Sequence, residues 1–207
     1  MMKRTMLSVA SVLIIARLCS AEIIGVAGGY GAPPPTLGPY EMTPFPLDDR
    51  PLWEWVDDVP SPLGGAASFS VPLQHLRAGF GWGSWGHGYE GDVYSSYGSG
   101  DSVIMGLPEG TRAFYFYASN FLDHMVAIWA VADDGTDLVQ LSQWGAAAYF
   151  GFYQDDPLGL PIEWIEVSCP SAGMVAVGEF GIAIPGAGAL AMLGVAALGA
   201  GLRRRRQ

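Results

Sequence analysis

Apolar and polar residues alternate along much of the second half of the chain, with the period of two that is typical of β-strands. The clearest case places Phe114 and Phe116 on one face of an extended stretch and Tyr115 and Tyr117 on the other. Met125 to Ala132 and Leu138 to Trp144 flank the sequence Asp133-Asp134-Gly135-Thr136-Asp137, which is a hairpin signal. The stretches that we expect to be strands are residues 102–105, 112–118, 125–132, 138–144, 147–153, 162–169 and 174–182.

These stretches recur at intervals of roughly ten residues, and no part of residues 22–184 has a convincing helical period. Short strands at that spacing indicate an antiparallel arrangement. The sequence therefore predicts an all-β fold, an antiparallel β-sandwich or jelly roll, over residues 66–183.

Residues 22–65 have a different composition, rich in glycine and proline. Proline lacks the N–H that a helix or a central strand requires. We therefore expect an extended, loop-rich segment, and its Trp53 and Trp55 indicate that it lies on the surface of the sandwich.

The N-terminus has the organisation of a secretory signal peptide. Lys3 and Arg4 precede an apolar stretch over residues 5–16, and small residues occupy the positions that a signal peptidase recognises. This pattern predicts a signal peptide over residues 1–21, cleaved between Ala21 and Glu22.

The C-terminus, residues 184–207, combines an apolar stretch with a basic cluster. Residues 186–202 carry no charge and would span about 25 Å as a helix, slightly less than a membrane core of about 30 Å. Two interpretations remain open: a single-span transmembrane anchor, or a sorting signal that is held in the membrane briefly and then cut. In both, the arginines stay on the cytoplasmic side. The residues of this expected signal are Ile184, Pro185, Gly186, Arg203, Arg204, Arg205 and Arg206.

The segment between the two ends is strongly acidic. It holds three arginines and all twenty acidic residues, a formal net charge of −17 compared with −10 for the whole chain. Nucleic-acid binding requires clustered lysine and arginine, so we expect no nucleic-acid partner. Cys169 is the lone cysteine after removal of the signal peptide, and its apolar surroundings favour burial over pairing between chains.

Taken together, these features resemble the PEP-CTERM proteins, which are substrates of exosortases, and in particular a group of them from planctomycete-like bacteria. The resemblance rests on the tail from Ile184 to Arg206 and on strand phrases such as residues 113–118, 149–153 and 177–182. Gly186-Ala187-Gly188 replaces the remainder of the usual Pro-x-Pro pattern after Pro185. The resemblance implies export, processing by an exosortase-type enzyme in the membrane, and a place in the cell envelope or extracellular matrix. It implies no catalytic residues.

A glycine-rich loop over residues 79–89 carries Trp82, Trp85 and Tyr89. These rings are candidates for stacking on sugar rings of an extracellular polysaccharide. The alternative is that they pack together as a small core at one end of the domain.

The acidic and imidazole side chains offer weaker candidates. Asp133, Asp134 and Asp137 provide oxygen ligands for calcium, but a hairpin turn explains them without a metal. His75, His87 and His124 are the three histidines, and no two have the spacing of a zinc site. Asp123-His124 would be half of an acid–base pair.

No nucleophile elbow is present, and the segment between the two ends contains no lysine for Schiff-base chemistry. We therefore expect no enzyme activity, no cofactor and no metal. The preferred hypothesis is an exported, non-enzymatic surface or matrix protein, and the alternative is a carbohydrate-binding β-sandwich.

Overall fold

The computed structural model describes residues 22–184 except Asp123 and Trp144. These residues contain β-strands and no helix. The strands are β1 (Ile23–Ala27), β2 (Thr36–Leu37), β3 (Tyr40–Glu41), β4 (Thr43–Pro44), β5 (Trp55–Pro60), β6 (Ala66–Ala78), β7 (Gly81–Trp82), β8 (Asp92–Ser95), β9 (Ser102–Gly106), β10 (Ala113–Ser119), β11 (Val126–Ala132), β12 (Asp137–Ser142), β13 (Ala148–Gln154), β14 (Trp164–Ser168) and β15 (Ala176–Ala183).

The strands from β9 onwards agree with the sequence-based prediction to within one or two residues at most ends. β11 and β12 pair as the predicted hairpin, with Val131 opposite Asp137. The alternation of apolar and polar residues therefore identified these strands correctly. The all-β, antiparallel class is confirmed; the one exception among the described pairings is the short parallel contact of β6 with β7.

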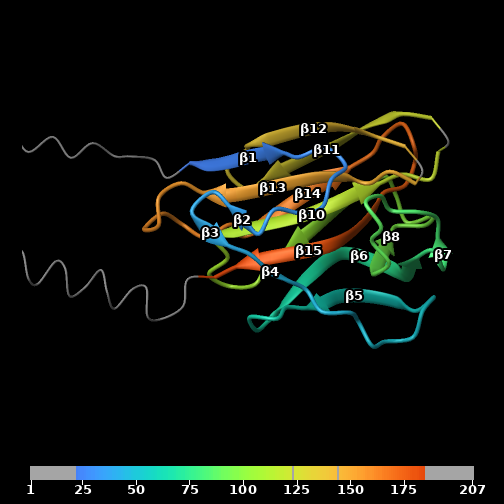
Figure 1. The fold of residues 1–207 in the computed structure, drawn as a ribbon, viewed down its shortest axis with the longest axis horizontal. Coiled ribbons are helices and arrows are strands. Elements are labelled where there is room, and N and C mark those ends of the chain that lie inside the picture. The colour runs from blue at the N-terminus through green and yellow to red at the C-terminus, as the bar shows by residue number, and fades with distance from the viewer. Residues whose placement is uncertain (1–21, 123, 144, 185–207) are drawn as a thin grey trace, which may run out of the picture.

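The main strands form one continuous sheet instead of two separate ones (Figure 1). The order along it is β1-β13-β10-β15-β8-β6-β9-β14-β11-β12, with β4, β5 and β7 attached at its sides. β6 makes the connection because it is thirteen residues long. Its first half pairs with β9 at Phe69, and its second half pairs with β8 at His75.

The sheet folds over until its two end strands meet, so that it is nearly closed. β1 contacts β12, where Gly25 leaves room for the side chain of Leu138: a Cβ at Gly25 would lie 3.0 Å from it. The backbone N–H of Ile23 donates to Asp134 Oδ2 at 2.9 Å, and the Thr136 hydroxyl donates to the Ile23 carbonyl at 2.9 Å. β1 and β12 are thus joined by side-chain contacts and single hydrogen bonds, and the two strands do not pair through a backbone ladder.

The main core lies inside the folded sheet. Phe114 and Phe116 from β10 and Phe150 and Phe152 from β13 are fully buried there. The rings of Phe116 and Phe150 stack with centroids 5.3 Å apart. Aliphatic side chains from the opposite half of the sheet, including Ile165, complete this core.

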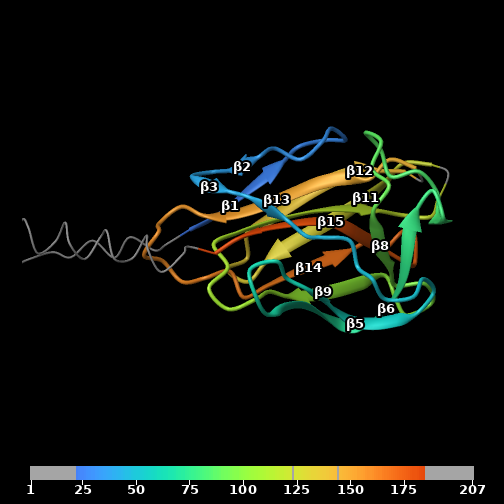
Figure 2. The ribbon, with the colours of Figure 1, turned by 60° about the horizontal axis from the view of Figure 1, so that its bottom comes forward.

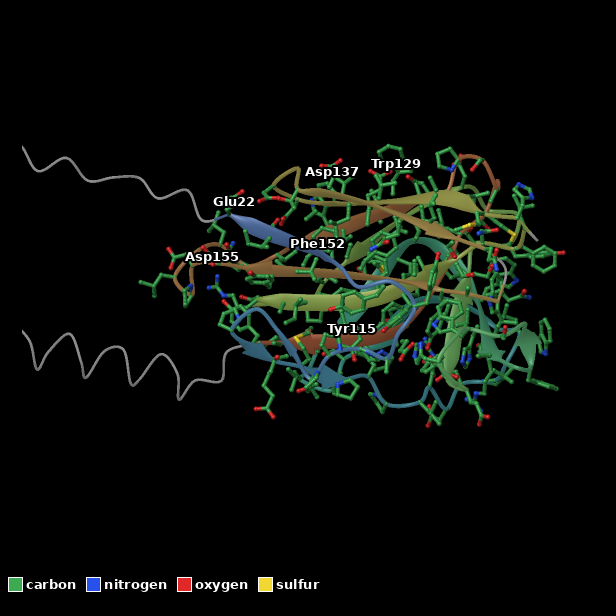
Figure 3. All side chains as sticks on the ribbon, turned by 45° about the horizontal axis from the view of Figure 1, so that its top comes forward. Glu22, Tyr115, Trp129, Asp137, Phe152 and Asp155 are labelled. Carbon is green, nitrogen blue, oxygen red and sulfur yellow. The ribbon has the colours of Figure 1, made fainter. Side chains whose placement is uncertain are left out.

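A second core lies on the outer face of β10, β13 and β15. Tyr115, Tyr117 and Tyr149 project from this face, as the alternation along β10 predicts, and they too are buried. The segment containing β2 and β3 lies over this part of the sheet (Figure 2). Its Tyr40 hydroxyl donates to the Gln154 carbonyl at 3.0 Å. In Figure 3, Tyr115 lies beneath this N-terminal segment. This half of the sheet is therefore buried on both faces.

Residues 22–65 are part of this single fold. β1, β4 and β5 pair with β13, β15 and β6 respectively, and β2 and β3 pair with each other. Each of these strands has one strand partner among the described residues, which is the edge position that proline tolerates.

The first and last strands place both ends of the described chain at one end of the molecule. Ile23 lies opposite Gln154, and Ala113 lies opposite both Tyr153 and Ala183.

The expected signal peptide and the expected C-terminal helix at 186–202 lie outside the described residues. Within the part of the chain that the structure describes, no helix is long and apolar enough to span a membrane.

The packing of tyrosine rings against glycines gives a first prediction. A Cβ at Gly181 would lie 2.1 Å from the Tyr115 ring, so Gly181→Ala forces the ring or the strands apart. We expect a loss of about 1–3 kcal/mol in the free energy of unfolding, measured by urea denaturation.

Gly31→Ala is the matched control, because nothing lies within 4 Å of the added methyl group. The double variant Gly181→Ala/Tyr115→Ala removes the clash. Its loss of unfolding free energy should therefore be smaller than the sum of the losses in the two single variants. Equal stability of Gly181→Ala and Gly31→Ala would contradict the packing argument.

Candidate functional site

The predicted aromatic loop is packed into the protein. Trp82 and Trp85 are 4% and 1% exposed, and their rings meet edge to face with centroids 6.2 Å apart. Tyr89 is partly buried against the same second core. Neither tryptophan therefore presents an open face to a sugar ring, and their positions fit the small-core interpretation.

An open aromatic groove lies beside this loop and is formed by different residues. Trp53, Tyr97 and Phe121 are each more than half exposed and line a groove of about 390 Å³ with Trp82 at its base. Phe121 meets Trp82 edge to face at 6.1 Å. The remaining lining residues are Gln74, Leu76 and Gly81.

The groove lies at the end of the sheet opposite Ile23 and Ala183. Tyr97 follows β8 just after Ser95, which pairs with Ala176 at the start of β15. Phe121 follows the last residue of β10, Ser119, which pairs with the same Ala176. Loops from distant parts of the sequence thus meet at this end of the molecule.

Trp53 is held in an unusual backbone conformation. Its φ is 73°, in the left-handed region that residues other than glycine seldom adopt. Its N–H donates to the His75 carbonyl at 2.7 Å, and its ring lies against Gly81, whose added Cβ would be 3.0 Å away. The neighbouring structure fixes this ring at the rim of the groove.

A buried ionic network supports the Trp53 turn from below. Asp92 Oδ1 lies 3.0 Å from His75 Nε2 and accepts from Arg77 Nη2 at 2.8 Å. Asp92 Oδ2 accepts from the Asp48 N–H at 2.6 Å. His75 Nδ1 lies 3.2 Å from the Pro51 carbonyl. Both nitrogens of this fully buried ring therefore have hydrogen-bonding partners.

A second carboxylate extends the network to the surface. Asp48 accepts from Arg50 and from the Tyr94 hydroxyl, the latter at 3.0 Å, and Arg50 also bonds Asp58 at 3.0 Å. Hydrogen bonds from Arg50 and Tyr94 lower the pKa of Asp48 against the opposing effect of its burial. Burial also raises the pKa of Tyr94 far above its usual range, so the phenol remains a donor.

His87 and Glu179 form a second polar pair, under the segment that covers the tyrosines. His87 Nε2 lies 2.8 Å from Glu179 Oε1, and His87 Nδ1 lies 3.2 Å from the Tyr30 carbonyl. Both residues have positive φ, 34° and 51°. A proton must lie between Nε2 and Oε1, because without it two acceptors would face each other.

Burial sets the acidity of this region. It raises the pKa of Glu179, although the hydrogen bond from His87 opposes the shift. Burial together with the Glu179 charge raises the pKa of Tyr115 to about 12. The pair is therefore a partly buried, proton-sharing link between the loop at 79–91 and β15.

The aspartates of the β11–β12 hairpin act as acceptors for backbone groups. Asp134 accepts from Ile23 and, at 2.8 Å, from Thr136, and Asp133 accepts from the Glu163 N–H at 2.7 Å. The bond between Asp134 and Thr136 is the turn role that the sequence suggested, whereas the bonds from Ile23 and Glu163 connect the turn to distant segments. Among residues 22–184, as far as they are described, no group of His, Cys, Asp and Glu side chains is arranged to hold a metal ion.

The remaining predicted residues have separate positions. Cys169 is fully buried, as predicted, and burial raises the pKa of its thiol. His124 is exposed on the loop between β10 and β11, and its neighbour Asp123 lies outside the described residues. Glu22 and Ile184 are at the ends of the described chain. Ala21, Pro185, Gly186 and Arg203–Arg206 lie beyond them.

No protein-family model matches the chain, and comparison with curated proteins and with solved structures gives no significant match. Function is therefore argued from the residues themselves. Sequence reasoning missed the groove because Trp53, Tyr97 and Phe121 come from three loops that share no motif or period.

The ionic network gives a second prediction. Asp92→Asn removes the buried carboxylate that pairs with Arg77 and is hydrogen-bonded to His75. We expect a loss of about 3–5 kcal/mol in the free energy of unfolding, measured by chemical denaturation. Asp137→Asn, at an exposed position, is the matched control and should change stability by less than about 0.5 kcal/mol. Similar values for the two variants would show that the network does not stabilise the fold.

The raised pKa of Glu179 gives a third prediction, on pH dependence. The folded protein holds this proton to a higher pH than the unfolded chain, where the ordinary value is 4.5. Its contribution to stability is complete below that ordinary value and is lost as the pH rises through the raised one. Glu179→Gln does not titrate, so its Tm minus that of the unmodified protein should increase from about pH 4 to pH 8. Glu109→Gln, at an exposed turn, should give a flat difference. A flat or falling difference for Glu179→Gln would refute the assignment.

Proposed function

We propose that the chain is an exported, non-enzymatic protein of the cell surface or extracellular matrix, delivered by its signal peptide and sorted through its C-terminal segment. In this proposal residues 186–202 form a membrane helix and an exosortase-type enzyme processes the tail. The folded, all-β part between the two ends acts as the ectodomain.

The observation that carries the proposal is the position of the two chain ends. Ile23 and Ala183 lie at the same end of the sheet, three strands apart in the sheet order. A domain attached to a membrane through either end would present its opposite end, with the aromatic groove, to the outside.

Charge supports the same proposal. The segment of residues 22–184 has a net charge of −17, and Arg50 and Arg77 are bound to buried or half-buried aspartates. Such a surface keeps a protein soluble outside the cell and disfavours binding to nucleic acid.

The hydrogen bonds of His75 and His87 support a non-enzymatic role. His75 is hydrogen-bonded between Asp92 and the Pro51 carbonyl, and His87 is hydrogen-bonded between Glu179 and the Tyr30 carbonyl. The ring nitrogens of both imidazoles are thus engaged by groups of the protein itself, which disfavours a role in general-base catalysis.

A carbohydrate-binding role is the second candidate function. The open groove of Trp53, Tyr97 and Phe121 favours it, in place of the buried Trp82 and Trp85.

The test of export is the intact mass of the protein recovered from the surface of the cells that make it. We expect loss of the first 21 residues, together with loss of the tail beyond about Pro185 where the sorting signal is cut. A variant that ends at Ile184 should be released into the medium. Recovery of the full-length chain from the cytoplasm alone would overturn the proposal, and a surface protein that retains Arg203–Arg206 would identify a plain anchor.

A further inference from the structure

We infer that the groove lined by Trp53, Tyr97 and Phe121 binds a neutral saccharide, with one sugar ring stacked on the indole of Trp53. This inference deepens the carbohydrate-binding candidate and rests on it, but it is independent of export. It places the ligand on residues that the sequence did not suggest.

The Trp53 ring is a preorganised platform. Its backbone is fixed by the hydrogen bond to the His75 carbonyl, and His75 is itself held by Pro51 and Asp92. The ring lies on Gly81 yet remains 52% exposed. An exposed ring that is already ordered loses little conformational entropy when a ligand stacks on it. The strain at φ 73° is typical of positions retained for a function.

The charge of the lining indicates a neutral ligand. No acidic or basic residue lines the groove, although the surrounding segment carries a net charge of −17. An anionic polysaccharide would be repelled by this protein, and a cation would find no carboxylate in the groove. The groove is thus suited to an uncharged molecule.

The mixture of apolar faces and polar atoms indicates a sugar over a purely apolar ligand. Trp53 and Phe121 provide ring faces, while Gln74 and Tyr97 provide an amide and a hydroxyl. Trp82 Nε1 at the base is buried and has no hydrogen-bond acceptor among the described residues. A sugar presents C–H groups to aromatic faces and hydroxyls to such donors, so it satisfies both kinds of group.

The dimensions of the groove agree with this assignment. Its volume of about 390 Å³ falls within the range of roughly 300–1,000 Å³ that is common for small-molecule sites. Its position opposite the chain ends leaves it accessible to an extended polymer.

The experiment is isothermal titration of the full chain, purified in mild detergent, with neutral gluco-, manno- and xylo-oligosaccharides and with polygalacturonate as the anionic comparison. We expect binding of a neutral oligosaccharide that changes little with salt, because no ionic contact is made. Trp53→Ala should weaken this binding by about tenfold or more. Trp129→Ala is the matched control, since Trp129 is 43% exposed on β11 and does not line the groove (Figure 3).

Two further variants keep the inference testable if Trp53→Ala does not fold. Trp53→Phe keeps an aromatic face and should retain part of the affinity, whereas Tyr97→Ala should lower the affinity. Thermal unfolding verifies that each variant is folded.

The inference would be overturned if none of the neutral oligosaccharides bound, or if Trp53→Ala and Trp129→Ala lost the same amount of affinity. Binding of an apolar peptide or lipid probe that depends on Trp53, without sugar binding, would overturn it as well. The intact mass of the surface protein is unaffected by any of these results, so a failure here is separate from a failure of export.

Discussion

The close approach of tyrosine rings to glycines on the outer face of β10, β13 and β15 is the constraint on which the rest of the structure depends. Gly181 gives room to Tyr115, and both Gly28 and Gly151 give room to Tyr149, each at distances where a Cβ would clash. With the rings this close to the backbone, the segment of β2 and β3 can pack over them. The result is a half-sheet buried on both faces, which explains why all seven residues of β10 are buried.

The second organising feature is the burial of charge in a protein with few cations. Among the three arginines of residues 22–184, Arg50 pairs with Asp48 and Arg77 pairs with Asp92, and His75 forms a further hydrogen bond with Asp92. A buried carboxylate is tolerated when it is paired and fully hydrogen-bonded, as Asp92 is. The network joins residues 48–58 to β6 and β8, and it ends directly beneath Trp53. The ionic network therefore positions the aromatic platform of the groove.

The two ends of the sheet have different properties. At one end the chain enters and leaves, next to aspartates that accept hydrogen bonds from backbone groups. At the other end, loops after β8 and β10 expose aromatic rings around an uncharged groove. Such a polarity suits a protein held at a surface by one end and available for contact at the other.

The sequence by itself determined the strands and their faces, because a period of two is a local property. The phenylalanines and tyrosines of β10 face opposite sides as the alternation required, and the hairpin at 133–137 follows from its turn residues. Burial of Cys169 was also predictable from its apolar neighbours. Tertiary structure alone decided that one long strand, β6, joins two halves into a single nearly closed sheet. It also decided that Trp82 and Trp85 are buried while Trp53, Tyr97 and Phe121 surround the groove. Exposure of an aromatic ring depends on which distant segments cover it, and no local pattern encodes that.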